Sequence, residues 1–154
     1  MTTSNATPAS SILVPAMGRA GRLAVGLLVW LGLGALGGGA VLVAKPDGSV
    51  MQMPLSMLAG SPFPDFLVPG LILGGLFGVG SFATAAMGLR RWRVAPFLAF
   101  AIGCAQMIWI VVELAIIKGF SVLHPLYFLT GLGIAAAAVP WGWPTFQGWR
   151  ASRR

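Results

Sequence analysis

Four long apolar runs, separated by short polar or basic stretches, dominate the hydropathy pattern of the chain. The first three runs, 23–43, 66–89 and 94–117, together contain a single charged side chain, Glu113. Each run is long enough to cross about 30 Å of hydrocarbon as a helix, because a helix rises about 1.5 Å per residue. The pattern therefore predicts transmembrane helices over these three ranges.

The fourth apolar run is bounded by prolines. Its uninterrupted part, 126–139, is too short to span a bilayer. The helix must begin near Ser121, with Pro125 in its first turn, or continue past Pro140. We expect a fourth span over 122–143, so the predicted fold class is an all-α, integral membrane, up-down four-helix bundle. The tryptophans that follow predict an interfacial aromatic belt, namely Trp141, Trp143 and Trp149.

The rest of the chain is divided between two tails and one long connection. Residues 1–22 are predicted to be a flexible cytoplasmic tail, 23–143 the transmembrane domain, and 144–154 a basic cytoplasmic tail. Within the 44–65 connection, residues 54–60 begin with proline and end with glycine. This spacing predicts a short external helix at the membrane surface between the first two spans. Asp65 stands where its carboxylate would cap the second span.

Basic residues give the chain a net charge of +7, but they lie beside the apolar runs and not on a separate soluble face. Eight of the ten fall in the two tails and the 90–93 loop. The positive-inside rule then places both termini in the cytoplasm. Such clusters are typical of contact with anionic lipid headgroups, so we expect membrane lipids as partners and no nucleic acid. The preference for arginine, alanine and glycine is compatible with a GC-rich bacterial genome, hence a bacterial inner membrane.

Glycines recur at spacings of four within the first two predicted spans. They are Gly34 and Gly38 on the first, and Gly70, Gly74 and Gly78 on the second. In lipid there is little hydrophobic drive between helices, and small residues allow their backbones to approach closely. One interpretation is packing within the bundle; the alternative is contact with another membrane subunit.

The candidates for chemistry cluster toward the predicted external side. Glu113 lies within the third span, and an ionisable residue there indicates function by default. Gln106 and Trp109 precede it on the same helical face, while His124 and Asp65 begin the spans on either side. We predict a ligand or proton site formed by these five residues. If the helical faces coincide, the site continues as a polar track from the external surface toward the midplane, with hydroxyls supplied by Ser81, Thr84 and Thr130.

Three interpretations of Glu113 stay open. It could take up a proton or cation, with His124 as its exchange partner. It could orient the head of a lipid or quinone-like ligand between apolar walls. The structural alternative is that Glu113 reaches the interface or pairs with Lys118 or His124.

The composition argues against most enzyme classes. The chain has one histidine, one cysteine (Cys104) and three acidic residues, fewer than a typical metal site and a catalytic set would need together. A Ser-His-Asp arrangement has no supporting spacing. We therefore predict no catalytic residue, no metal and no cofactor.

A resemblance to a known group rests on residues 60–73, which read GSPFPDFLVPGLIL, and on the later helix with Trp109 and Glu113. The pattern resembles that of small four-span bacterial membrane proteins of uncharacterised function, and it implies a fold but no activity. The predicted function is a non-catalytic accessory, scaffold or ligand-binding bundle of the inner membrane. The alternatives are a small proton-coupled transporter using Glu113 and, third, a membrane enzyme acting on a lipid.

Overall fold

The computed structural model describes residues 17–116 and 120–151, and the side chains of that part up to residue 144. Its elements are helices, and α2, η4 and α3 follow one another without a break as one long helix. They are α1 (Arg19–Ala44), the 3-10 helices η2 (Ser49–Met51) and η3 (Leu55–Leu58), α2 (Leu67–Leu71), the π-helix η4 (Ile72–Val79), α3 (Gly80–Leu89), α4 (Ala95–Ile116) and α5 (Leu123–Ala151).

Four helices in the described part are long and apolar enough to cross a membrane: Arg19–Ala44, Leu67–Leu89, Ala95–Ile116 and Leu123–Pro144. The chain is thus a small multi-pass membrane protein, and the prediction of an all-α four-helix bundle is confirmed. Helix α1 begins at Arg19, inside the segment predicted as a tail. Helix α5 carries Pro125 in its first turn and continues through Pro140 and Pro144. Its backbone stays helical to Ala151, where the sequence predicts a tail from 144 onward.

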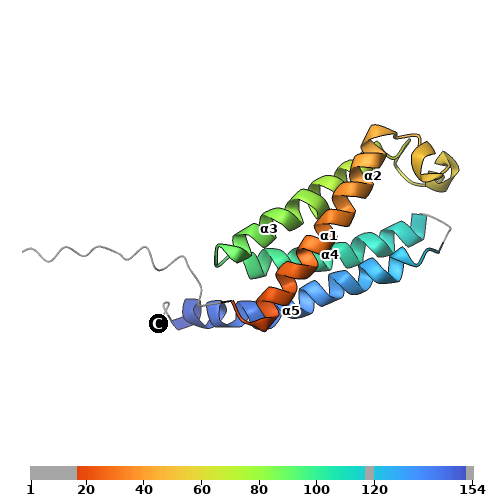
Figure 1. Cartoon of the computed structure of the whole chain (residues 1–154). Helices are drawn as coiled ribbons and strands as arrows, with labels where there is room; N and C mark the ends of the chain where they lie inside the picture. Colours follow the sequence, from red (N-terminus) through yellow and green to blue (C-terminus); the bar gives the residue numbers. More distant parts are fainter. Residues whose placement is uncertain (1–16, 117–119, 152–154) are drawn as a thin grey trace, which may run out of the picture.

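The four spans form two antiparallel hairpins (Figure 1). In one, α1 packs along α2, η4 and α3; in the other, α4 packs along α5. The hairpins meet through contacts of α1 with α5 and of α3 with α4. Each span therefore packs mainly against antiparallel neighbours, which is the up-down arrangement expected from short connections.

The hairpins run apart toward one end of the bundle (Figure 1). At the end that carries Arg19, Arg22 and the 90–93 turn, here named the arginine end, α3 packs on α4. At the opposite end, here named the loop end, lie the 45–66 segment, the last turns of α4 and the start of α5. The two hairpins are separated there, and the 45–66 segment extends beside the end of α2.

Close glycine contacts hold α1 against the second span. A methyl group placed on Gly39 would lie 2.5 Å from the amide nitrogen of Gly74 and 2.8 Å from the carbonyl oxygen of Gly70. On Gly78 it would lie 2.8 Å from the side chain of Leu36. The predicted stripe on the second span therefore faces α1 within the chain. Contact of that stripe with a partner subunit stays a prediction from the sequence.

The residue of α1 that comes closest to the backbone of the second span is Gly39, one residue beyond the predicted Gly38. A methyl group on Gly38 would lie 3.2 Å from Leu73. Gly34 serves a different neighbour, since a methyl group there would collide with the hydroxyl of Tyr127 from α5. Gly34 thus makes room for an aromatic side chain, whereas Gly39 makes room for a backbone.

A tryptophan closes the arginine end. Trp141 of α5 is only 9% exposed and lies between Gly21 of α1 and Gly88 of α3. A methyl group on Gly21 would lie 3.0 Å from its indole nitrogen, and one on Gly88 would lie 2.8 Å from the far edge of its ring. The prediction of an interfacial belt is wrong for Trp141, because glycines on two helices create a slot for it in the core. Trp143 is exposed, and the side chain of Trp149 lies outside the described residues.

Candidate ligand-binding cavity

The 45–66 segment closes on itself beside the bundle. The amide of Phe66 donates a hydrogen bond to the carbonyl of Pro46 (2.9 Å), which joins the start of the segment to its end. The Phe66 ring is 2% exposed and packs with Leu42 and Leu58. The short helix expected over 54–60 is the 3-10 helix η3, which follows Pro54. The segment therefore presents apolar side chains to the ends of α1 and α2.

Asp65 caps the start of the second span, as its position predicts. Its Oδ1 accepts a hydrogen bond from the amide of Leu67 at 2.9 Å. That amide has no carbonyl partner within the helix, so the carboxylate satisfies it. Asp65 does not line the cavity described next. The structure gives it a local structural role.

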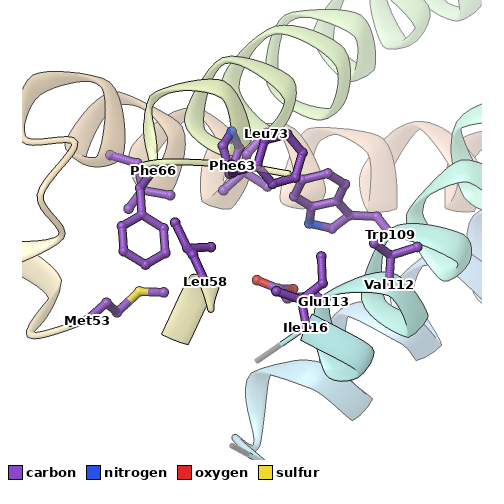
Figure 2. A pocket seen from close by; sticks show the side chains of 11 residues that line it. Met53, Leu58, Phe63, Phe66, Leu73, Trp109, Val112, Glu113 and Ile116 are labelled. Carbon is purple, nitrogen blue, oxygen red and sulfur yellow. The ribbon is translucent and has the colours of Figure 1, made fainter. Parts of the chain in front are cut away.

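A cavity of about 100 Å³ lies at the loop end, between the 45–66 segment and the last turns of α4 (Figure 2). The side chains of the described residues that line it are apolar except for Glu113 and the indole nitrogen of Trp109. The side chains come from α1, the 45–66 segment, α2, η4 and α4, and they are Leu42, Met53, Leu58, Phe63, Phe66, Pro69, Leu73, Trp109, Val112, Glu113 and Ile116.

Glu113 and Trp109 both turn toward this cavity from α4. Figure 2 shows the carboxylate of Glu113 reaching from the helix toward Leu58, and the indole nitrogen of Trp109 on the cavity side of its ring. The Trp109 ring is supported by Phe77 of η4, with ring centroids 5.9 Å apart and planes tilted by 54°. The spacing of four residues on one helix brings an acceptor and a donor to the same wall.

Gln106 lies deeper in the bundle and does not line the cavity. It is 2% exposed, and a methyl group on Gly131 of α5 would lie 3.1 Å from its Cβ, which places it at the α4–α5 interface. Its Oε1 has no hydrogen-bond partner within the described part of the chain, and the same holds for Oγ of the buried Ser81. The predicted polar track is therefore not continuous. The Thr130 hydroxyl donates to the carbonyl of Leu126 in its own helix (2.9 Å).

His124 acts locally at the start of α5. Its Nδ1 accepts a hydrogen bond from the amide of Ser121 (2.9 Å), and its ring stacks on Phe120 at a centroid distance of 6.0 Å. Among the described residues no ion pair joins Glu113 to a base, and His124 does not line the cavity. Lys118, the other predicted partner, lies outside the described residues. The structure thus brings Trp109 and Glu113 together and places Gln106, His124 and Asp65 elsewhere.

The remaining wall residues were not singled out from the sequence. Leu58, Phe63 and Phe66 come from the connection, and Leu42 and Leu73 come from spans that are apolar on every side. The available signal was the apolar content of residues 54–66 next to a bundle end, which fits a segment that covers a cavity. Nothing in the hydropathy of Leu42 or Leu73 distinguishes them from lipid-facing neighbours.

Asp47 is the other acidic residue of this end. Its Oδ1 accepts hydrogen bonds from the amide and the hydroxyl of Ser49, at 3.0 and 2.7 Å. These bonds hold the pKa of Asp47 below its ordinary value. Asp47 belongs to the turn that leaves α1 and does not line the cavity.

Within residues 17–116 and 120–151, no group of three or more His, Cys, Asp and Glu side chains is placed to hold a metal ion. No known family model, curated protein or solved structure matches the chain. Its function has to be argued from the cavity itself, and the resemblance to small four-span bacterial proteins stays a prediction.

Proposed function

We propose that the protein is a non-catalytic membrane bundle that binds an amphiphilic molecule by one end, in the cavity at the loop end. The observation that carries this proposal is the lining. Glu113 and Trp109 face a space whose other walls are apolar and come from four further segments of the chain. Small-molecule sites have this character, an apolar cavity with a few convergent polar groups.

The size of the cavity supports binding of one end of a molecule. At about 100 Å³ it is smaller than the cavity of roughly 150 Å³ that holds one benzene. It is also well below the roughly 300–1,000 Å³ of sites that enclose a drug-sized ligand. The rest of a longer ligand would therefore lie outside. Val112, which lines the cavity and is 43% exposed, marks a route from the cavity toward the lipid-facing surface of α4.

The proposed setting is a bacterial inner membrane with the arginine end in the cytoplasm and the loop end outside. The support is the basic cluster of Arg19, Arg22 and the 90–93 turn. Single cysteines test it, in a chain whose native Cys104 is replaced by alanine. A membrane-impermeant maleimide added to intact cells should label Ser56→Cys in η3 and should leave Arg90→Cys unlabelled. The reverse pattern would overturn the orientation.

Filling the cavity tests the binding function. Val112→Phe adds a ring at the cavity wall, whereas Val111→Phe places the same ring on the neighbouring exposed residue, which does not line the cavity. The probe is decanol, added to the full-length protein in detergent micelles, and native mass spectrometry measures the one-to-one complex. We expect Val112→Phe to reduce the complex about fivefold or more, because the added atoms occupy the site. Val111→Phe should leave it within about twofold of the wild type. Equal behaviour of the two variants would refute binding in this cavity.

A small proton-coupled transporter that uses Glu113 is the second candidate, and the position of this ionisable side chain on a membrane span, with its carboxylate facing a cavity, favours it. Glu113→Gln separates the two candidates. Loss of a proton-dependent flux of the bound molecule in reconstituted vesicles would support the carrier. If the wild-type protein binds decanol but shows no proton-dependent flux of it, the result would support the binding bundle and not the carrier.

A further inference from the structure

We infer that the end of the ligand held in this cavity is a primary ammonium group, bound against Glu113 among aromatic side chains. This inference rests on the proposed function and names the chemical class of its ligand. It follows from the charge of the lining, the aromatic rings in the cavity wall and the volume available.

The charge of the lining disfavours ligands whose head group is a carboxylate, a phosphate or an alcohol. Among the described residues that line the cavity, Glu113 is the one ionisable side chain, and no described base forms an ion pair with it. The ring of His124 is hydrogen-bonded to Ser121 at the start of α5 and is not part of the wall. A ligand carboxylate or phosphate would meet the like charge of an ionised Glu113 there, and an alcohol would bring no cation to pair with that carboxylate in apolar surroundings. A cation removes both costs.

The rings in the wall favour the same class of ligand. Trp109, Phe63 and Phe66 contribute aromatic surface, and Phe77 supports the Trp109 ring from behind. Aromatic faces attract ammonium groups, and the attraction is strongest for tryptophan and in sites shielded from water. The carboxylate of Glu113 reaches toward Leu58 into the same space that the indole nitrogen of Trp109 faces (Figure 2). A carboxylate combined with aromatic walls is suited to an ammonium ion.

The volume selects a small ammonium. About 100 Å³ is less than the roughly 150 Å³ of a cavity that holds one benzene, so the space suits an ammonium group with its first few carbons. A trimethylated head would use most of that space without its chain. The preferred ligand is therefore an amphiphile with a primary amine and a chain that continues past Val112 into the lipid.

Three probes of equal chain length test the inference on the full-length wild-type protein at pH 7. Decylamine, decanol and decanoate are titrated separately into the protein in a non-ionic detergent, and the one-to-one complexes are measured by native mass spectrometry. We expect decylamine to bind about tenfold more tightly than decanol, with decanoate weakest. Decyltrimethylammonium should bind less tightly than decylamine. Equal affinities of decylamine and decanol would overturn the inference, and this comparison requires no variant to fold.

Variants then assign the preference to the carboxylate. Glu113→Gln keeps the shape of the side chain and should reduce the preference for decylamine over decanol to below about threefold, while Glu113→Asp should retain part of it. Val112→Phe should weaken both probes alike. If Val112→Phe changes neither probe, the proposed function fails. If it weakens both, but decylamine has no advantage in the wild type, the proposed function stands and the ammonium inference fails.

Discussion

The two ends of this bundle use aromatic side chains in opposite ways. At the arginine end Trp141 fills the slot between Gly21 and Gly88 and joins three helices. At the loop end Trp109 is supported on one side by Phe77 and faces a cavity on the other. The same residue type therefore closes one end and lines an open space at the other.

The difference shows how a small bundle can combine a rigid end with a binding site. In lipid, helices are held by close packing and not by hydrophobic exclusion from water, so a filled slot fixes where they converge. Helices fixed at one end are free to separate at the other, and the hairpins run apart toward the loop end. We expect substitutions at the arginine end to affect stability most and those at the cavity to affect binding most.

Removing the tryptophan should have the largest effect. Trp141→Ala leaves a cavity between three helices and should lower the free energy of unfolding by about 3–5 kcal/mol. Denaturant unfolding of the protein in detergent micelles measures it. The matched control is Trp30→Ala on α1, where the side chain is 50% exposed and its contacts can be replaced by detergent or lipid. Similar losses for the two variants would contradict a special role for the slot at the arginine end.

Separating α1 from the second span should have the next largest effect. Gly39→Ala places a methyl group against the backbone of Gly74 and should cost about 1–3 kcal/mol, because neither helix can give way by rotating a side chain. Gly37→Ala is the control, since a methyl group there meets nothing within 4 Å. The same unfolding measurement applies. If the control costs as much as Gly39→Ala, close approach of the two backbones is not what holds this hairpin.

Replacing Gln106, in the core between the two ends, should raise the free energy of unfolding instead of lowering it. Gln106→Met removes a buried oxygen that has no partner in the described part of the chain, and should raise the free energy of unfolding by about 1–2 kcal/mol. Decanol binding should not change, because Gln106 does not line the cavity. Thr130→Val provides the contrast, since it removes a hydroxyl that is hydrogen-bonded to Leu126. A loss of decanol binding in Gln106→Met would restore the continuous polar track.

A smaller effect is expected at the cap of the second span. Asp65→Ala should cost about 1 kcal/mol, because the amide of Leu67 loses its acceptor. Asp65→Asn keeps an oxygen in place and should be close to the wild type. Thermal unfolding in micelles distinguishes the two. A strong effect of either variant on decylamine binding would mean that Asp65 belongs to the site.

The smallest effect concerns the turn after α1. The folded-state pKa of Asp47 is lowered, so the stabilisation from its bonds to Ser49 is complete above the ordinary value of 3.8 and is lost as the pH falls through the lower, folded-state value. NMR of the Ser49 amide should show a titration midpoint below 3.8. Ser49→Ala removes the hydroxyl bond and should move the midpoint of its amide upward. An unchanged midpoint would show that the hydroxyl contributes nothing to the turn.

The sequence was sufficient to predict the membrane spans, but it did not show which face of each span turns inward. Long apolar runs predict α1, the second span and α4, and the glycine spacing predicts that Gly74 lies at a helix contact. The burial of Trp141 could not be predicted, because in a helix that is apolar on every side polarity does not indicate which face turns inward. Its neighbours Gly21 and Gly88 lie 120 and 53 residues before it in the sequence.

The candidate site was predicted in part for a similar reason. Glu113 and Trp109 lie on one helix, so their spacing alone places them on a common wall. Gln106 shares that face but lies two turns deeper, where α5 covers it. The apolar walls depend on how the 45–66 segment folds back on Phe66, and that is determined by tertiary contacts. The π-helix η4 has no clear signal in the sequence beyond its glycines, and it carries Leu73 to the cavity.

The slot for Trp141 also has a consequence for how the protein is made. Its two glycine walls belong to α1 and α3, which are synthesised early, whereas Trp141 is near the end of the last span. The first three helices must therefore wait in the membrane with the slot unfilled while the ribosome completes the chain. A chain cut before α5 would expose that slot to lipid, and we expect it to be a preferred target for membrane quality-control proteases.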